Sequence, residues 1–164
     1  MKKAQTEHIF IYVMTGVLVS LIFIYGYKAI TDFRQKTEDI GFIKFRNEIV
    51  NAIKNIYSEY STVEIRGFDV PQTYNEVCFV ETKNTPLPAT TNYKYKIIED
   101  SITSGENKNV FLISNRVVKK SFYIEEKISV GNTQGSPILC IDSINSKIKL
   151  RLEGKGDYAL IGKA

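Results

Sequence analysis

The sequence predicts an α+β protein in which a long N-terminal transmembrane and amphipathic helix precedes an antiparallel β-sheet or small sandwich domain. Three observations predict it: an uncharged apolar run, apolar residues at three- and four-residue spacing behind it, and short alternating segments from Ser61 onward. We divide the 164 residues into a basic leader or cytoplasmic tail (1–8), a transmembrane helix (9–27), an amphipathic helical stalk (28–60) and a β-rich extracytoplasmic domain (61–164).

The transmembrane prediction depends on residues 9–27, which contain no charged side chain. A helix rising about 1.5 Å per residue over this run is roughly long enough to cross a hydrocarbon core of about 30 Å. A cleavable secretory signal is the main alternative, because Lys2 and Lys3 form a positive n-region. However, Tyr27 stands where a cleavage site needs a small residue, and the apolar run is long for a signal peptide. We therefore predict a retained single-pass anchor in a lipid bilayer.

The first residues carry the one motif that is typical of a family. Met-Lys-Lys-Ala-Gln-Thr-Glu combines a basic leader, a small residue (Ala4), Gln5 and an acid (Glu7), followed by the apolar run. This segment resembles the N-terminus of type IV pilin-like proteins, in particular archaeal ones with a class III signal. The resemblance implies peptidase cleavage between Ala4 and Gln5, self-assembly with other pilin-like subunits, and a helix whose outer half packs on a folded domain. The chain departs from the pattern in having Ala4 instead of glycine and Glu7 two residues after Gln5 instead of four. An uncleaved anchor with a short cytoplasmic tail is the alternative.

The helical pattern continues beyond the apolar run as an amphipathic stripe. Apolar side chains recur at positions 42, 45, 49, 53, 56 and 60. No proline interrupts residues 1–70, so we expect one helix from about Gln5 to Tyr60. Gly41 is the one candidate for a break, and a separate amphipathic helix that begins there is the alternative.

The remainder of the chain changes to the patterns of short strands. The clearest alternation is Ile148-Lys-Leu-Arg-Leu152. Further strands are expected at residues 63–65, 77–80, 93–98, 110–113, 121–124, 138–141 and 158–161. Turns are expected at residues 66–67, 85–88, 104–105, 131–132, 135–137 and 153–156.

Composition argues against most catalytic chemistry and against nucleic-acid binding. The only histidine is His8, which lies beside the apolar run. The domain therefore has no histidine for a Ser-His or Cys-His nucleophile pair or for an imidazole-based metal site. The net charge of +4 is mild and scattered. Tyr93-Lys-Tyr-Lys96 suits a strand with one aromatic face better than a base-stacking site. We expect no enzyme activity, no cofactor, no metal and no nucleic-acid partner. A site formed by carboxylates that are distant in the sequence and converge in the fold is the alternative.

The two cysteines, Cys78 and Cys140, each lie in an apolar strand pattern. A disulfide between them would close a long loop and would indicate an oxidising compartment. Two buried free thiols are the alternative.

The charges that flank the apolar run bear on membrane topology. Lys28, Arg34 and Lys36 conflict with a cytoplasmic N-terminus by simple charge counting. The leader and the cysteine pair favour a cytoplasmic N-terminus and an extracellular C-terminal domain in the cell membrane.

Two function classes follow from this architecture. The first is a non-catalytic structural subunit of a pilin-like filament or envelope layer, whose helices pack together. The second is a membrane-anchored receptor or accessory subunit that binds a ligand or partner through its β-domain. The surface of the helix separates them, because filament packing needs a second apolar face besides the one that the domain covers.

Overall fold

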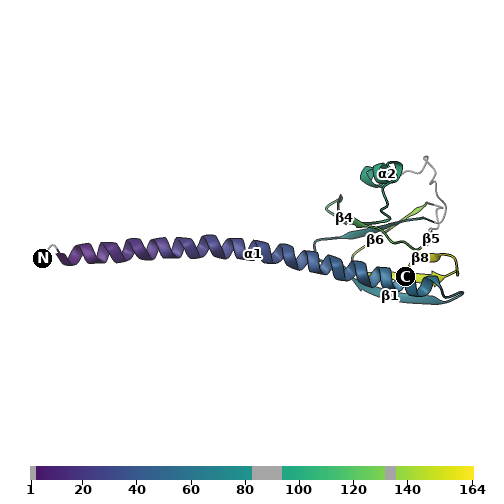
Figure 1. Ribbon diagram of the computed structural model, residues 1–164, viewed down its shortest axis with the longest axis horizontal. Coiled ribbons are helices and arrows are strands. Elements are labelled where there is room, and N and C mark those ends of the chain that lie inside the picture. The colour runs from purple at the N-terminus through teal and green to yellow at the C-terminus, as the bar shows by residue number, and fades with distance from the viewer. Residues whose placement is uncertain (1–2, 83–93, 132–135) are drawn as a thin grey trace. The chain divides into compact units, whose positions relative to one another are not determined.

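The computed structural model describes residues 3–82, 94–131 and 136–164, with side chains from residue 9 onward. The chain divides into two compact units, Met1–Ile40 and Gly41–Ala164. The second unit contains two four-stranded sheets and a short helix, α2 (Figure 1). This arrangement confirms the predicted α+β class.

Helix α1 (Lys3–Tyr57) forms all of the described first unit and enters the second. It stays helical through Gly41, so the secondary structure shows no separate helix beginning there, although the boundary between the two units falls at the same residue. The helix ends three residues before the predicted Tyr60, and Ser61 has a positive φ of 64°. The predicted stripe supplies the buried face of the second half, whereas Tyr60 and Ile43 are exposed.

The two sheets have different strand orders. Sheet A runs β1 (Val63–Asp69), β7 (Lys147–Gly154), β8 (Ala159–Lys163), β5 (Ile128–Gly131). Sheet B runs β4 (Val117–Phe122), β3 (Val110–Ser114), β2 (Glu76–Val80), β6 (Ile138–Asp142). All pairings are antiparallel except that of β5 with β8, which is parallel. The sheets therefore form a mostly antiparallel, mixed arrangement.

One continuous core joins the second half of α1 to both sheets. Helix residues Phe45, Ile49 and Ile53 pack with alternate residues of sheet A and of sheet B. In β7 the alternation is strict, since Ile148, Leu150 and Leu152 are buried while Lys149 and Arg151 between them are exposed. This burial accounts for the clear period of two in the sequence.

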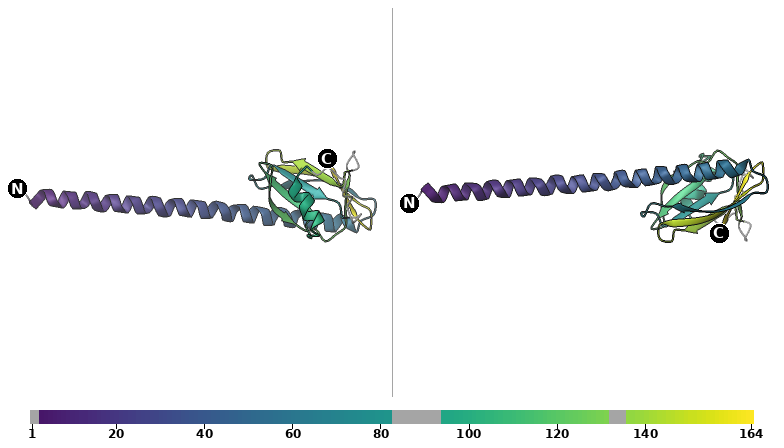
Figure 2. Two further views of the ribbon diagram at one scale, coloured as in Figure 1. Left: turned by 90° about the horizontal axis from the view of Figure 1, so that it is seen from above. Right: turned by 90° about the horizontal axis from the view of Figure 1, so that it is seen from below.

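Helix α2 (Lys96–Thr103) packs on the face of sheet B that points away from the main core. In the view from above it lies over the strands (Figure 2). Its Ile98 is buried in a second cluster with Cys78, Phe111 and Ile113, the residues that alternate with those of the main core. The predicted strand at 93–98 is therefore wrong for its described part. A pair of isoleucines one turn apart, Ile98 and Ile102, packs on the sheet, which suits a helical period of 3.6.

Several boundaries also differ from the prediction. The strand expected at 121–124 is β4, which ends at Phe122, and β5 was not predicted. The turn expected at 66–67 lies inside β1, whereas tight turns occur at Asn115–Arg116 and Asn145–Ser146, with φ between 49° and 65°. Asparagine tolerates this left-handed region better than most residues. The turn expected at 85–88 lies outside the described residues.

Candidate functional site

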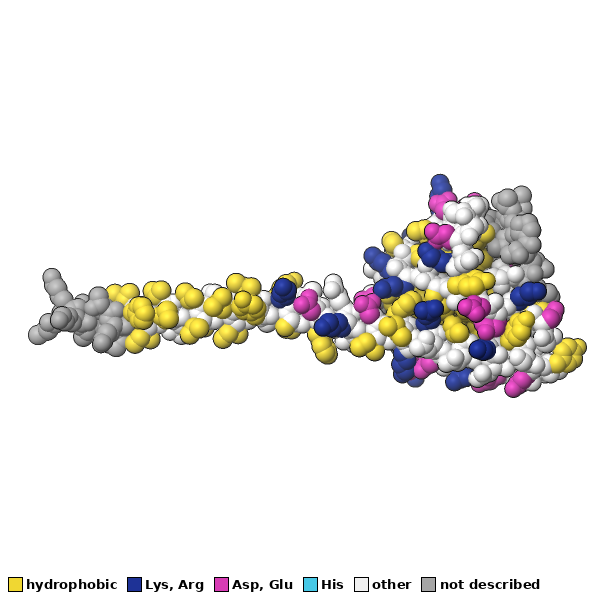
Figure 3. Space-filling model, viewed as in Figure 1, with side chains coloured by type: hydrophobic (Ala, Val, Ile, Leu, Met, Phe, Trp, Pro, Cys, Tyr) yellow, Lys and Arg dark blue, Asp and Glu magenta, His cyan; other side chains and the backbone are white. Residues whose placement is uncertain are grey.

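The apolar segment (residues 9–27) is the first candidate site. In the described part of the chain, α1 is the one helix long and apolar enough to cross a membrane, with a mean hydropathy of 2.3 over its most apolar 18 residues. None of that window is buried within the protein, and its large apolar side chains are exposed; Figure 3 shows them along the visible face of the helix. By length and composition the segment is therefore suited to anchor the chain in a membrane. A signal sequence shares these two properties.

The serine and threonine hydroxyls within the apolar segment are satisfied by the helix itself. The hydroxyl of Ser20 donates to the carbonyl of Gly16 at 2.8 Å, and that of Thr15 donates to the carbonyl of Ile11. Because lipid offers no hydrogen-bond partners, a spanning segment must satisfy its polar groups internally. These hydroxyls therefore do not oppose transfer of the segment into a bilayer.

The predicted leader residues Ala4, Gln5 and Glu7 belong to the first turns of α1. Their side chains lie outside the described part of the chain. Cleavage between Ala4 and Gln5 therefore stays a prediction.

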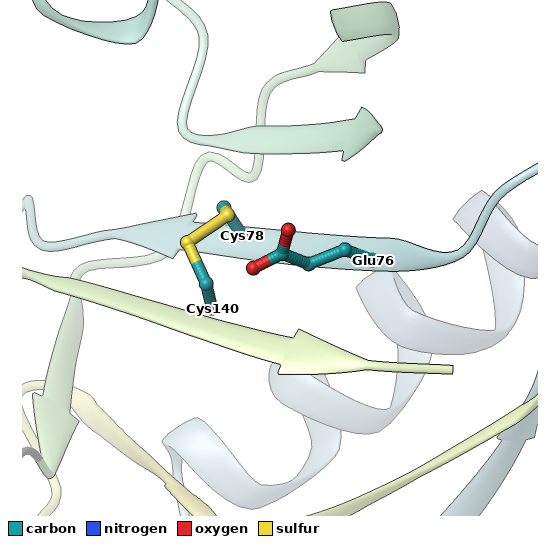
Figure 4. A group of neighbouring side chains, drawn as sticks. All are labelled: Glu76, Cys78 and Cys140. Atoms are coloured by element: carbon teal, nitrogen blue, oxygen red, sulfur yellow. A yellow bond between two sulfur atoms is a disulfide. The ribbon is translucent and has the colours of Figure 1, made fainter. Parts of the chain in front are cut away.

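The second candidate site surrounds the disulfide between Cys78 and Cys140 (Figure 4). The two residues face one another directly in the antiparallel pairing of β2 with β6, with their Cα atoms 4.0 Å apart and a sequence separation of 62. The predicted disulfide is confirmed. Sequence reasoning found both partners because each cysteine interrupts an apolar strand, but the register that aligns them is a property of the sheet.

A buried carboxylate lies beside the disulfide. Glu76 is two residues before Cys78 on β2, on the same side of the strand, and is only 6% exposed. It accepts a hydrogen bond from the ammonium group of Lys94 at 2.6 Å and another from the phenol of Tyr95. Burial of a carboxylate is tolerated when it is paired and hydrogen-bonded, as it is here.

The cluster perturbs the ionisation of both donors. The hydrogen bond to Glu76 raises the pKa of Lys94, because it stabilises the ammonium form. Burial and, second, the hydrogen bond to Glu76 raise the pKa of Tyr95, because both favour the neutral phenol. Glu76 therefore ties the segment that precedes α2 to the start of β2.

Glu76, Cys78 and Cys140 place one carboxylate oxygen and two sulfurs within 4.8 Å of one another. A metal ion takes thiolates, however, and the disulfide leaves neither sulfur as a thiolate. The carboxylate is already engaged by Lys94 and Tyr95. We therefore assign a structural role to this group. The hydrogen bonds of Glu76 to Lys94 and Tyr95 hold the start of α2 on sheet B.

A shallow hollow of about 340 Å³ lies between α2 and β4. Its lining includes Lys108, Lys119 and Lys120 together with Asp100 and Glu106. The ammonium nitrogen of Lys108 lies 2.7 Å from a carboxylate oxygen of Glu106, to which it donates a hydrogen bond. This bond lowers the pKa of Glu106. The hollow thus carries both signs of charge, three lysines against two acidic residues, and its net charge is small.

The Glu76 cluster was not foreseen from the sequence. The local pattern predicts Lys94 and Tyr95 as alternating residues of a strand, and nothing in it relates them to Glu76, which lies 18 residues before Lys94. Among the other acidic residues of the domain, a carboxylate oxygen of Glu64 lies 3.9 Å from a guanidinium nitrogen of Arg66, and one of Asp69 lies 3.6 Å from the ammonium nitrogen of Lys147. Comparison of the chain with family models, with curated proteins and with solved structures gave no match.

Proposed function

We propose that this chain is a single-pass membrane-anchored, non-catalytic structural subunit of the pilin-like class. The observation that carries the proposal is the apolar segment, whose side chains are exposed all round a helix that has no covering element among the described residues. In water such a surface is costly, at about 25 cal/mol for each Å² of apolar area. Lipid and the same segment of neighbouring copies are the two environments that remove this cost.

The second half of the same helix supports an assignment to a structural subunit. Phe45, Ile49 and Ile53 are buried in the domain, so one face of this half serves the fold while the apolar segment stays available for lipid or other helices. This division of one helix between a domain and an apolar surface is what the pilin-like resemblance implies.

The disulfide supports an extracytoplasmic location of the domain. Bridges persist in oxidising compartments and are rare where cellular thiol systems keep cysteines reduced. Residues 41–164 would then face the outside, with the N-terminus in the cytoplasm. This orientation agrees with the positive charges of Lys2 and Lys3. In our proposal, the disulfide outweighs the conflicting positive charges of residues 28–36.

Anchoring is tested by extraction of membranes with carbonate. The full-length chain should stay in the membrane pellet. Leu18→Arg should weaken retention, because a charge near the centre of a spanning helix costs about 2.5–3.5 kcal/mol. Thr31→Arg adds the same charge beyond the segment and is the matched control. Release of the wild-type chain without detergent would contradict anchoring.

Processing is tested by the intact mass of the membrane-extracted protein. A mature chain that begins at Gln5 supports the pilin-like class, and Ala4→Leu should then block removal of the leader because its side chain is larger. A chain that begins at Met1 or Lys2 would refute processing while leaving the anchor in place.

Assembly through the helix is tested by photo-crosslinking. A photoreactive residue at Val19, in the apolar segment, should give multimers of this chain in membranes. The same residue at Asn47, an exposed position of α1 in the second unit, is the control. Crosslinks at Val19 to lipid alone would contradict the structural subunit and favour the anchored receptor or accessory subunit instead.

A further inference from the structure

Strand β1 is the longest of the four edge strands in the part of the chain that the structure describes. It ends sheet A, has seven residues and lies at the border of the domain (Figure 1). At the other end of sheet A, the edge of β5 is covered by residues 81–82, since the amide of Thr82 donates to the carbonyl of Ile128 and the carboxylate of Glu81 accepts from the amide of Val130. In sheet B, β4 carries Lys119, Lys120 and a register shift, which are typical protections against edge pairing.

The backbone groups of β1 that face outward can be identified from its pairing with β7. The amide of Gly154 donates to the carbonyl of Thr62, and the amide of Val70 donates to the carbonyl of Ser146. In an antiparallel pair the bonded residues alternate, so the even-numbered residues of β1 face β7. The amides and carbonyls of Val63, Ile65 and Gly67 therefore point to the free edge.

The side chains of β1 are also unusual for an exposed edge. Ile65 is 67% exposed and Val63 is 47% exposed, and both alternate with a pair of opposite charges, Glu64 and Arg66. The strand contains no lysine and no proline, and its pairing with β7 shows no register shift. Such an edge is a template for another strand.

The charges select which strand fits. Two antiparallel copies of β1 with Ile65 opposite Ile65 would place Glu64 of each copy opposite Arg66 of the other, and Val63 opposite Gly67. The next register in one direction would place Glu64 opposite Glu64, and the next in the other direction Arg66 opposite Arg66. Like charges directly opposite one another are destabilising, so the neighbouring registers are disfavoured.

The same register also satisfies the backbone. With Ile65 opposite Ile65, the bonded pairs are those between odd-numbered residues, whose amides and carbonyls face the free edge. Glu64 and Arg66 then form the non-bonded pairs, in which opposite side chains approach more closely. Hydrogen bonding and charge therefore select one symmetric arrangement.

We propose that two copies of this chain pair antiparallel through β1, centred on Ile65, and so join their A sheets into one sheet of eight strands. The interface is isologous, because the same residues serve both copies. It involves residues of the second unit only, so it does not depend on the proposed membrane anchoring or on packing of the apolar segments.

The position of the symmetry axis is tested by a single cysteine. The two native cysteines are bonded to each other, so Ile65→Cys adds the one free thiol of the chain. Opposite residues in a bonded antiparallel pair lie about 5.5 Å apart at Cα, within the range for a disulfide. Mild oxidation of the full-length chain in membranes should give crosslinked dimer.

Val117→Cys is the matched control, an apolar residue of similar exposure on the edge strand β4. The Ile65→Cys chain should form at least about five times more dimer than this control if the Cα atoms meet as proposed. Equal yields from the two variants would overturn the proposal. Multimers at Val19 together with no dimer at residue 65 would overturn edge pairing and leave the proposed function untouched.

The register is tested by exchange of charges in the Ile65→Cys background. Glu64→Arg and Arg66→Glu should each weaken dimer formation by about tenfold, because each places like charges opposite one another twice. A mixture of the two variants should restore it, since all four facing charges are then opposite in sign. The double variant Glu64→Arg/Arg66→Glu should dimerise as the parent does. Loss of dimer in both the mixture and the double variant would overturn the proposed register.

Discussion

Substitution of Gly154 by alanine should destabilise the domain more than alanine at a glycine whose added Cβ would make only ordinary contacts. Gly154 is the last residue of β7, and the end of α1 passes directly over it. A Cβ atom there would lie 1.8 Å from the carbonyl oxygen of Glu59 and 2.2 Å from that of Ile56. Both atoms belong to the backbone, so no side-chain rotation can relieve the contact.

The magnitude follows from what must move. The helix end and the strand would have to separate by about 1.5 Å to restore normal contact distances. Gly154 also donates to the carbonyl of Thr62 and accepts from the amide of Ser61, both at 2.9 Å, and these bonds would be strained. Overpacking costs about 1–3 kcal/mol, and each hydrogen bond contributes about 1 kcal/mol. We therefore expect a loss of about 3–5 kcal/mol.

The assay is thermal unfolding of the detergent-solubilised full chain, followed by circular dichroism. For a domain of this size the expected loss corresponds to a decrease in Tm of roughly 12–20 °C. Gly162→Ala is the matched control, since its Cβ would make ordinary contacts at 3.9 and 4.0 Å within the same sheet. A Gly154→Ala chain that unfolds within about 1 kcal/mol of the wild type would refute the close approach of helix and strand.

Three further changes test the domain. Cys140→Ala should lower stability by about 4 kcal/mol in the chain-entropy model, because the bridge spans 62 residues, and equal Tm values with and without reductant would contradict it. The raised pKa of Tyr95 implies that stability is fully present below its ordinary value of about 10 and decreases as the pH rises through the higher folded value. Tyr95→Phe should cost about 1–2 kcal/mol at neutral pH by removing a bond to Glu76, and should flatten that alkaline decrease in unfolding titrations. Asn109→Leu should cost about 2–3 kcal/mol in urea unfolding, because it leaves the buried amide and carbonyl of Ile124 without their bonds at 2.8 Å, and an unchanged midpoint would refute this.

The sequence by itself determined the features that depend on local periodicity. The apolar segment is visible because a charge-free run needs no knowledge of its neighbours. The buried stripe of α1 and the alternation of β7 repeat at the periods of helix and strand, and burial then acts on each residue separately. The two cysteines were recognisable as partners because each stands in an apolar strand.

Only the tertiary structure decided the features that depend on which segments meet. Residues 96–103 form a helix because Ile98 and Ile102 can pack over the disulfide face of sheet B, although their local pattern also suits a strand. Gly154 looked like a turn residue, and only the approach of the α1 end shows why it must lack a side chain.

The parallel pairing of β5 with β8 and the contact of Glu76 with Lys94 likewise join residues that are distant in the sequence. Local propensity differs between alternatives by about 1 kcal/mol or less per residue, whereas burial of a large side chain contributes about 1.5–3 kcal/mol. Where the two conflict, as they do before and within α2, long-range packing prevails, and a single sequence contains no local signal of it.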